Sequence, residues 1–175
     1  MNKAAIAIIV IILAVVVIGF VVIPAVGSTG YSMSVQNYDA EGNPVGAPIG
    51  SYSWIGPNGE PVSSVEVKVT WTISLDDVDP SSISVSVEIS VSYGLATIDS
   101  VAWSGTDTEG DHSAIWDLDT LLDPGDTVVL EFTGTINASG VGYSGEPVSD
   151  SWTDSVSIKY TYSEGTITIE GTIGV

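Results

Sequence analysis

The sequence predicts a mainly β protein in which an N-terminal α-helix of transmembrane length precedes a single antiparallel β-sandwich. The first observation behind this prediction is an uncharged, apolar run over residues 4–23. The second is a series of later segments in which apolar and polar residues alternate, which is typical of strands with one buried face. We therefore expect two domains: residues 1–27 as a hydrophobic helix and residues 28–175 as an acidic β-domain.

The apolar run is long enough to cross a bilayer as a helix. At 1.5 Å per residue, 20 residues span about 30 Å, and a backbone in lipid must satisfy its own hydrogen bonds. Pro24 and Gly27 follow the run, and Lys3 is the only charged side chain before it, so the N-terminus is expected in the cytoplasm if the segment is inserted. Three fates stay open: a retained anchor, a helix packed into a filament, or a signal removed near residues 25–27.

The strands are predicted in chain order by their period of two. Residues 65–75 and 83–93 alternate most regularly, and a Pro-containing turn separates them. The segment 114–122 offers one helical turn at most, and the Pro/Gly-rich stretch 42–61 is predicted as loop. The other predicted strands are 31–36, 51–54, 97–103, 128–136, 156–162 and 166–175, the last two forming a hairpin.

These short strands, separated by turn residues, indicate a β-sandwich of immunoglobulin-like type. A closed barrel is the alternative. The sequence shows no internal repeat and no linker long enough to divide the β-domain.

The charge balance excludes several classes of partner. The chain has three Lys residues, no Arg, and 22 Asp and Glu residues, which gives a net charge of −19 at pH 7. Such a surface repels nucleic acids and anionic lipid head groups, so membrane contact has to come from apolar residues. The chain has no Cys, which excludes disulfides, thiolate chemistry and Cys-based metal sites.

The sequence predicts no catalytic residues, and hence no enzyme. His112 is the single histidine and lies in a loop-like run, and residues 142–146 do not form a nucleophile elbow. Asp117 and Asp119, beside Trp116, have the residue types of a glycoside-hydrolase pair, but such pairs arise by chance in an acidic chain.

Two acidic runs are candidates for calcium, which prefers carboxylate and carbonyl oxygens. No other cofactor is expected, and solvated turn acids are the alternative interpretation. The candidate ligands are Asp76, Asp77 and Asp79 in the first run, and Asp107, Glu109 and Asp111 in the second.

Other surface features have a functional and a structural interpretation. Asn137-Ala138-Ser139 is an N-glycosylation sequon, which matters if the domain is exported. The five Trp residues could form an aromatic platform for sugars, but packing in the core is the default, and Trp71 lies on the apolar face of its strand.

One resemblance covers residues 83–136. The run from Trp116 to Phe132 contains a Pro124-Gly125 turn between two β-type segments, and it resembles Ig-like adhesion-type domains of prokaryotic surface proteins. The turn departs from that pattern by the extra Leu122-Asp123. The resemblance implies a fold more than an activity.

A second resemblance covers the N-terminus. Lys3-Ala4 followed by the apolar run is similar to archaeal type IV pilins and archaellins, in which a peptidase cuts after such a pair. The resemblance implies that the mature helices pack into a filament core with the β-domains outside. Ile11, Val15 and Gly19 are then candidate helix-packing residues.

The predicted function is a non-enzymatic structural or adhesive protein of an archaeal-type cell surface, self-assembling through its N-terminal helix as a filament subunit. The alternative is a membrane-anchored extracellular Ig-like module that binds calcium or carbohydrate. Expected partners are copies of the chain or membrane lipid, both through residues 4–23, and also a neighbour's sheet edge through residues 166–175. Nucleic acid is not expected.

Overall fold

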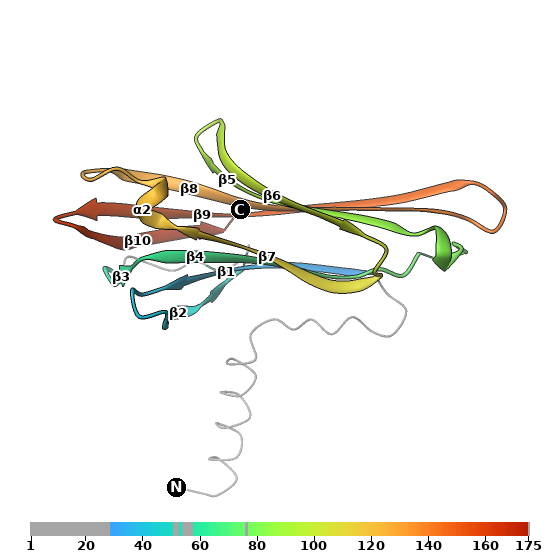
Figure 1. The fold of residues 1–175 in the computed structure, drawn as a ribbon, viewed down its shortest axis with the longest axis horizontal. Helices are drawn as coiled ribbons and strands as arrows, with labels where there is room; N and C mark the ends of the chain where they lie inside the picture. The colour runs from blue at the N-terminus through green and yellow to red at the C-terminus, as the bar shows by residue number, and fades with distance from the viewer. Residues whose placement is uncertain (1–28, 51–52, 54–57, 76, 175) are drawn as a thin grey trace, which may run out of the picture.

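The computed structural model describes residues 29–50, 53, 58–75 and 77–174, which form a mainly β structure of two antiparallel sheets (Figure 1). The four-stranded sheet has the order β2-β1-β4-β7, and the six-stranded sheet has the order β3-β10-β9-β8-β5-β6. The strands are β1 Gly30–Tyr38, β2 Pro44–Ile49, β3 Pro61–Val62, β4 Ser64–Thr72, β5 Ser84–Tyr93, β6 Ala96–Gly105, β7 Glu109–Asp117, β8 Thr127–Val141, β9 Pro147–Ser163 and β10 Thr166–Gly174.

The predicted fold class, a transmembrane-length helix before a single Ig-like sandwich, needs correction. The structure supports a mainly β protein of two sheets, and its described helices are only the 3-10 turn η1 (Pro80–Ser82) and the single-turn α2 (Leu118–Leu121). Among the described residues, no helix is long and apolar enough to cross a membrane. Residues 4–23 lie outside the described part, as do the predicted packing residues Ile11, Val15 and Gly19. The division at residues 27 and 28 stays a prediction.

Period-two alternation explains the central strands. In β4, Val65, Val67 and Val69 are buried while the residues between them face outward, and β5 follows the same pattern. β4 lies between β1 and β7, and β5 lies between β6 and β8, with antiparallel registers throughout. The prediction of strands over 65–75 and 83–93 is therefore confirmed, with ends that differ by at most three residues.

Two predicted loop regions are strands in the structure. β7 includes His112, for which the sequence predicts a loop, and β2 lies within the Pro/Gly-rich stretch 42–61. The inward positions of β7 include Gly110 and His112, which are not apolar residues, so the period-two pattern of a strand is missing there. The single turn α2 agrees with the prediction for 114–122, whereas the predicted strand 51–54 lies largely outside the described residues.

The core lies between the sheets and is built on a few large side chains. Trp71, Phe132 and Tyr160 are among the largest fully buried residues. The Tyr160 hydroxyl donates a hydrogen bond to Oδ1 of buried Asn37 over 2.7 Å, which joins β9 to β1. Gly134 lets the sheets approach closely, since a Cβ atom there would lie 2.6 Å from Cγ2 of Val69.

Two hairpins project from the sandwich. The β8–β9 hairpin extends beyond the remaining strands at the right of Figure 1, and the β5–β6 hairpin rises away from the sheets at the top. The long hairpin is tied to β1, because the Tyr31 hydroxyl donates to Oδ2 of Asp150 over 2.7 Å and its ring stacks on Trp152. The β8–β9 hairpin is therefore fixed to the four-stranded sheet at β1.

The Tyr31–Asp150 contact predicts a loss of stability in alkali. Burial, then the hydrogen bond and the negative charge of Asp150, raise the pKa of Tyr31 above its ordinary value of 10.0. A raised folded-state pKa gives stability that is complete below about pH 10 and is lost as the pH rises further toward the folded-state pKa. We expect Tyr31→Phe to cost about 1 kcal/mol at neutral pH and to make the alkaline decline shallower. Urea unfolding across the alkaline range measures this, and an unchanged pH slope in the variant would contradict it.

Candidate functional site

The end of the β5–β6 hairpin carries exposed apolar side chains. Leu95 is fully exposed at 108%, and Tyr93 and Ile98 beside it are exposed at 57% and 44%. Gly94 takes a φ of +61°, which lets the chain reverse tightly between the two strands. The sequence alternation predicted strands here, but it did not indicate that their apolar residues would face solvent.

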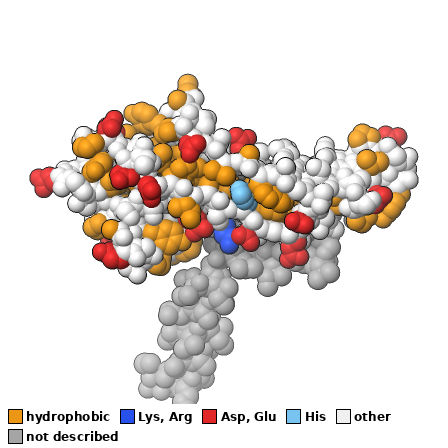
Figure 2. All heavy atoms as spheres, in the orientation of Figure 1, with side chains coloured by type: hydrophobic (Ala, Val, Ile, Leu, Met, Phe, Trp, Pro, Cys, Tyr) orange, Lys and Arg blue, Asp and Glu red, His pale blue; other side chains and the backbone are white. Residues whose placement is uncertain are grey.

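The end of the β8–β9 hairpin is a second apolar projection, with Val141 and Tyr143 exposed. Figure 2 shows hydrophobic side chains at both projecting ends. The loop before β5 supports this end: the amide of Tyr143 donates to the carbonyl of Asp77, and the amide of Asp79 donates to Val141. The side chain of Ser82 accepts from the amide of Val141 over 2.7 Å. The hairpin end is therefore held in place by backbone hydrogen bonds and by the Ser82 hydroxyl.

Together the two ends carry most of the large apolar side chains that are exposed in the described part of the chain. Such projections suit protein–protein contact, because burying them removes apolar area from water. Their backbone hydrogen bonds limit the conformational entropy lost on binding.

An aromatic cluster occupies the side of the sandwich where β6 and β7 form the sheet edges. Trp103 packs against Trp71 at 5.1 Å between ring centroids and against His112 at 6.3 Å. Nε1 of Trp116 donates to Oδ2 of Asp99 over 2.9 Å. Trp71 is only 2% exposed, so the prediction that it belongs to the core is confirmed.

The predicted calcium ligands make different contacts in the structure. Asp79 caps η1 by accepting from the amide and hydroxyl of Ser81, which lowers the pKa of Asp79. Asp111 forms a 3.0 Å ion pair with Lys68. Asp76 lies outside the described residues. Within the described ranges no three His, Asp or Glu side chains gather as a metal site. Calcium binding, with Asp77, Asp107 and Glu109 included, stays a prediction.

The sequon lies on the outer face of the six-stranded sheet. Asn137 is exposed on β8 and lines a groove of about 540 Å³ whose other side chains are mainly Ser residues of β5, β8 and β9. A modifying enzyme could reach this face, so the glycosylation prediction is compatible with the position. We expect Asn137→Gln to remove the added mass of a glycan from protein isolated from its own cells, measured by intact mass spectrometry. Equal masses for the variant and wild type, after correction for the substitution, would contradict the prediction.

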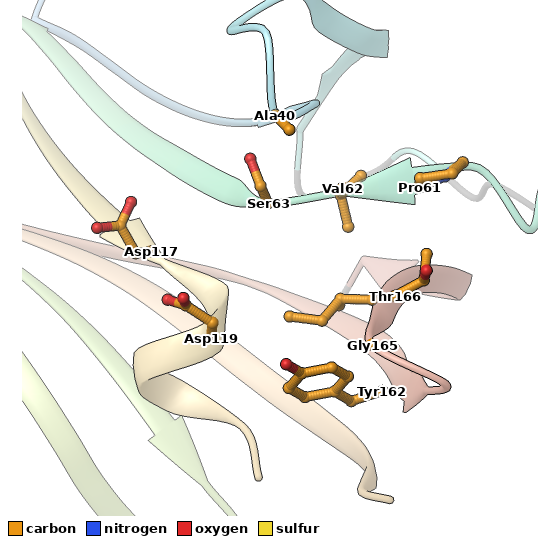
Figure 3. Close-up of a pocket in the computed structure, with 10 residues that line it drawn as sticks. Ala40, Pro61, Val62, Ser63, Asp117, Asp119, Tyr162, Gly165 and Thr166 are labelled. Atoms are coloured by element: carbon orange, nitrogen blue, oxygen red, sulfur yellow. The ribbon is translucent and has the colours of Figure 1, made fainter. Parts of the chain in front are cut away.

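A cavity of about 430 Å³ lies at the end where α2 meets β3, β9 and β10. Figure 3 shows Asp117 and Asp119 at one side of this cavity and Tyr162 at another. Ser63 also lines it, and two carboxylates with hydroxyl groups can accept hydrogen bonds from a polyol or an ammonium group. The acidic pair is evident in the sequence, but Ser63 and Tyr162 are not linked to it there, because β-strand pairing brings these residues together across long sequence separations.

The resemblances to pilins and to adhesion domains stay predictions. Comparison of the chain with protein-family models, with curated proteins and with solved structures finds no match.

Proposed function

We propose that this protein is a non-enzymatic structural or adhesive protein of a cell surface, and that it associates with copies of itself. The observation that supports this most is the distribution of exposed apolar residues. Five of the seven large hydrophobic side chains exposed in the described part of the chain lie on two projecting hairpins: Tyr93, Leu95, Ile98, Val141 and Tyr143.

The acidic charge supports the same function. A net charge of −19 keeps copies apart at most orientations and keeps them soluble. Contacts are then favoured where charge is sparse, which restricts association to a few geometries. A structural protein needs this combination of long-range repulsion and specific contact.

The sequence of residues 4–23 provides a second contact in this proposal. Its uncharged side chains associate with the same residues of neighbouring copies or with lipid. In a pilin-like assembly these segments would gather inside, and the acidic β-domains would face outward.

Electron microscopy of the purified full chain tests the proposal. We expect ordered assemblies of the wild-type protein, and their loss when Ile11 and Val15 are both changed to Asp. Val129→Asp, on the outer face of β8, is the matched control and should leave the assemblies intact. Dispersed monomers of wild-type protein at all concentrations would contradict the proposal.

The cavity beside Tyr162 favours a second candidate, a surface module that binds carbohydrate. Neutral oligosaccharides could hydrogen-bond to Asp117 and Asp119 while contacting the tyrosine ring. Calorimetric titration with neutral oligosaccharides tests this function. Binding that weakens at least tenfold in Asp119→Asn would support it, and no heat of binding to wild type would contradict it.

A further inference from the structure

The two sheets end in four edge strands, and three of them have features that discourage pairing with another strand. β2 contains Pro44 and Pro48, its register with β1 is irregular, and Gly46 has a φ of +72°. β7 carries exposed acidic residues at both ends, namely Glu109, Asp111 and Asp117. β3 is only two residues long and begins with Pro61. Prolines, irregular registers, short length and charge are the usual means by which edges avoid association.

β6 has fewer of these protections: its register with β5 shifts between Thr97 and Asp99, but residues 99–105 pair with β5 without interruption. It is a ten-residue edge strand with neither Pro nor Lys, and within the described residues only β5 pairs with it. Asp99 is its one charged residue, and the carboxylate is already engaged, accepting from Nε1 of Trp116 and from the amide of Ser100. The residues 96–100 are all exposed, so both faces of this part of the strand are accessible.

We propose that β6 pairs in antiparallel fashion with β6 of a second copy, which joins the two six-stranded sheets into one continuous sheet. The proposal rests on the self-association proposed above and specifies its interface. A strand edge recognises another strand through its backbone N–H and C=O groups, and a two-fold axis makes one edge its own complement.

The low charge of the β5–β6 hairpin favours a second copy at β6 itself. Two chains of net charge −19 repel each other, so they can approach closely only where acidic residues are few. The hairpin of residues 93–105 contains a single charged side chain, Asp99. Pairing at β6 also brings a partner strand next to the exposed Leu95 and Ile98, whose apolar surface would then be covered.

Cysteine cross-linking of the full chain tests the pairing directly, because the wild-type sequence contains no Cys. Ser100→Cys, Ala102→Cys and Ser104→Cys place one thiol at successive outward positions of β6. Ala47→Cys, exposed on the edge strand β2, is the matched control. We expect mild oxidation to give a disulfide-linked dimer with a maximum at one β6 position and little product from the control. Equal dimer from Ala47→Cys, or none from the β6 variants, would overturn the proposal.

A charge substitution tests the same interface without a cross-link. Ile98→Asp adds one carboxylate to β6 in each copy, whereas Val129→Asp changes a residue of similar exposure on a strand that is already paired on both sides. We expect sedimentation to show at least a tenfold weaker dimer for Ile98→Asp only, with both variants melting as cooperative folded proteins. Equal dimerisation of the two variants would overturn the β6 pairing. If ordered assemblies persist without β6 cross-linking, this inference fails alone; if the wild type does not associate at all, the proposed function fails with it.

Discussion

Replacing Trp71 with alanine is expected to lower the free energy of unfolding by about 4 kcal/mol. The side chain is 2% exposed and packs on Trp103 from the opposite sheet. Its Nε1 donates to the carbonyl of Asp107 over 2.9 Å, so the substitution also releases the turn between β6 and β7. The expected cost combines the lost packing, the cavity left behind and an unpaired carbonyl.

Urea unfolding followed by tyrosine fluorescence and circular dichroism measures this change. Tyr143→Ala removes a large aromatic ring that is 74% exposed, so it is the control for loss of an aromatic residue as such. We expect it to alter stability by no more than about 0.5 kcal/mol. Similar effects of the two substitutions would mean that Trp71 does not hold the sheets together.

The second large effect is expected at Gly134, where an added side chain would collide with the facing sheet. A Cβ atom would lie 2.6 Å from Cγ2 of Val69 and 3.0 Å from the sulfur of Met33. Gly134→Val therefore has to separate β8 from β1 and β4, and we expect a loss of about 3 kcal/mol. Thr133→Val, on the opposite face of the same strand, is the control and should be nearly neutral.

A double mutant separates steric conflict from other effects at this position. Val69→Ala removes the methyl group that a Cβ at residue 134 would strike. Gly134→Ala should therefore cost less in the Val69→Ala background than in the wild type, by at least about 0.5 kcal/mol. Strict additivity, measured by denaturant unfolding of the four proteins, would contradict the proposed contact.

The strands that the sequence predicted best are those with long runs of alternating Val and Ile. β4 and β5 are flanked by strands on both sides, so every inward residue is apolar and the pattern is unmistakable. β2 and β7 lie at sheet edges, where polar residues, Pro and Gly are tolerated. Their sequences therefore look like loops, and only pairing with β1 and β4 defines them as strands.

The proposed contact surfaces were less predictable than the strands. The alternation around Tyr93 and Ile98 is the same whether a hairpin covers the core or projects beyond it, and the difference depends on how far the facing sheet extends. Of the cavity residues, Ser63 lies between β3 and β4, Asp117 ends β7 and Tyr162 belongs to β9, so their proximity depends on register and topology. The sequence predicts a loop at His112, whereas the structure places it at an inward-facing position of β7, because only pairing with β4 defines this strand.

The most direct test of the central claim is immunogold electron microscopy of intact cells that make the protein, with antibodies against the folded β-domain. If the protein is a self-associating surface component, unpermeabilised cells will be labelled along ordered arrays or filaments with a regular repeat. The Ile98→Asp protein should keep the surface label but lose the regular repeat if β6 forms the contact. Label that appears only after permeabilisation, or that is scattered singly on wild-type cells, would contradict the account.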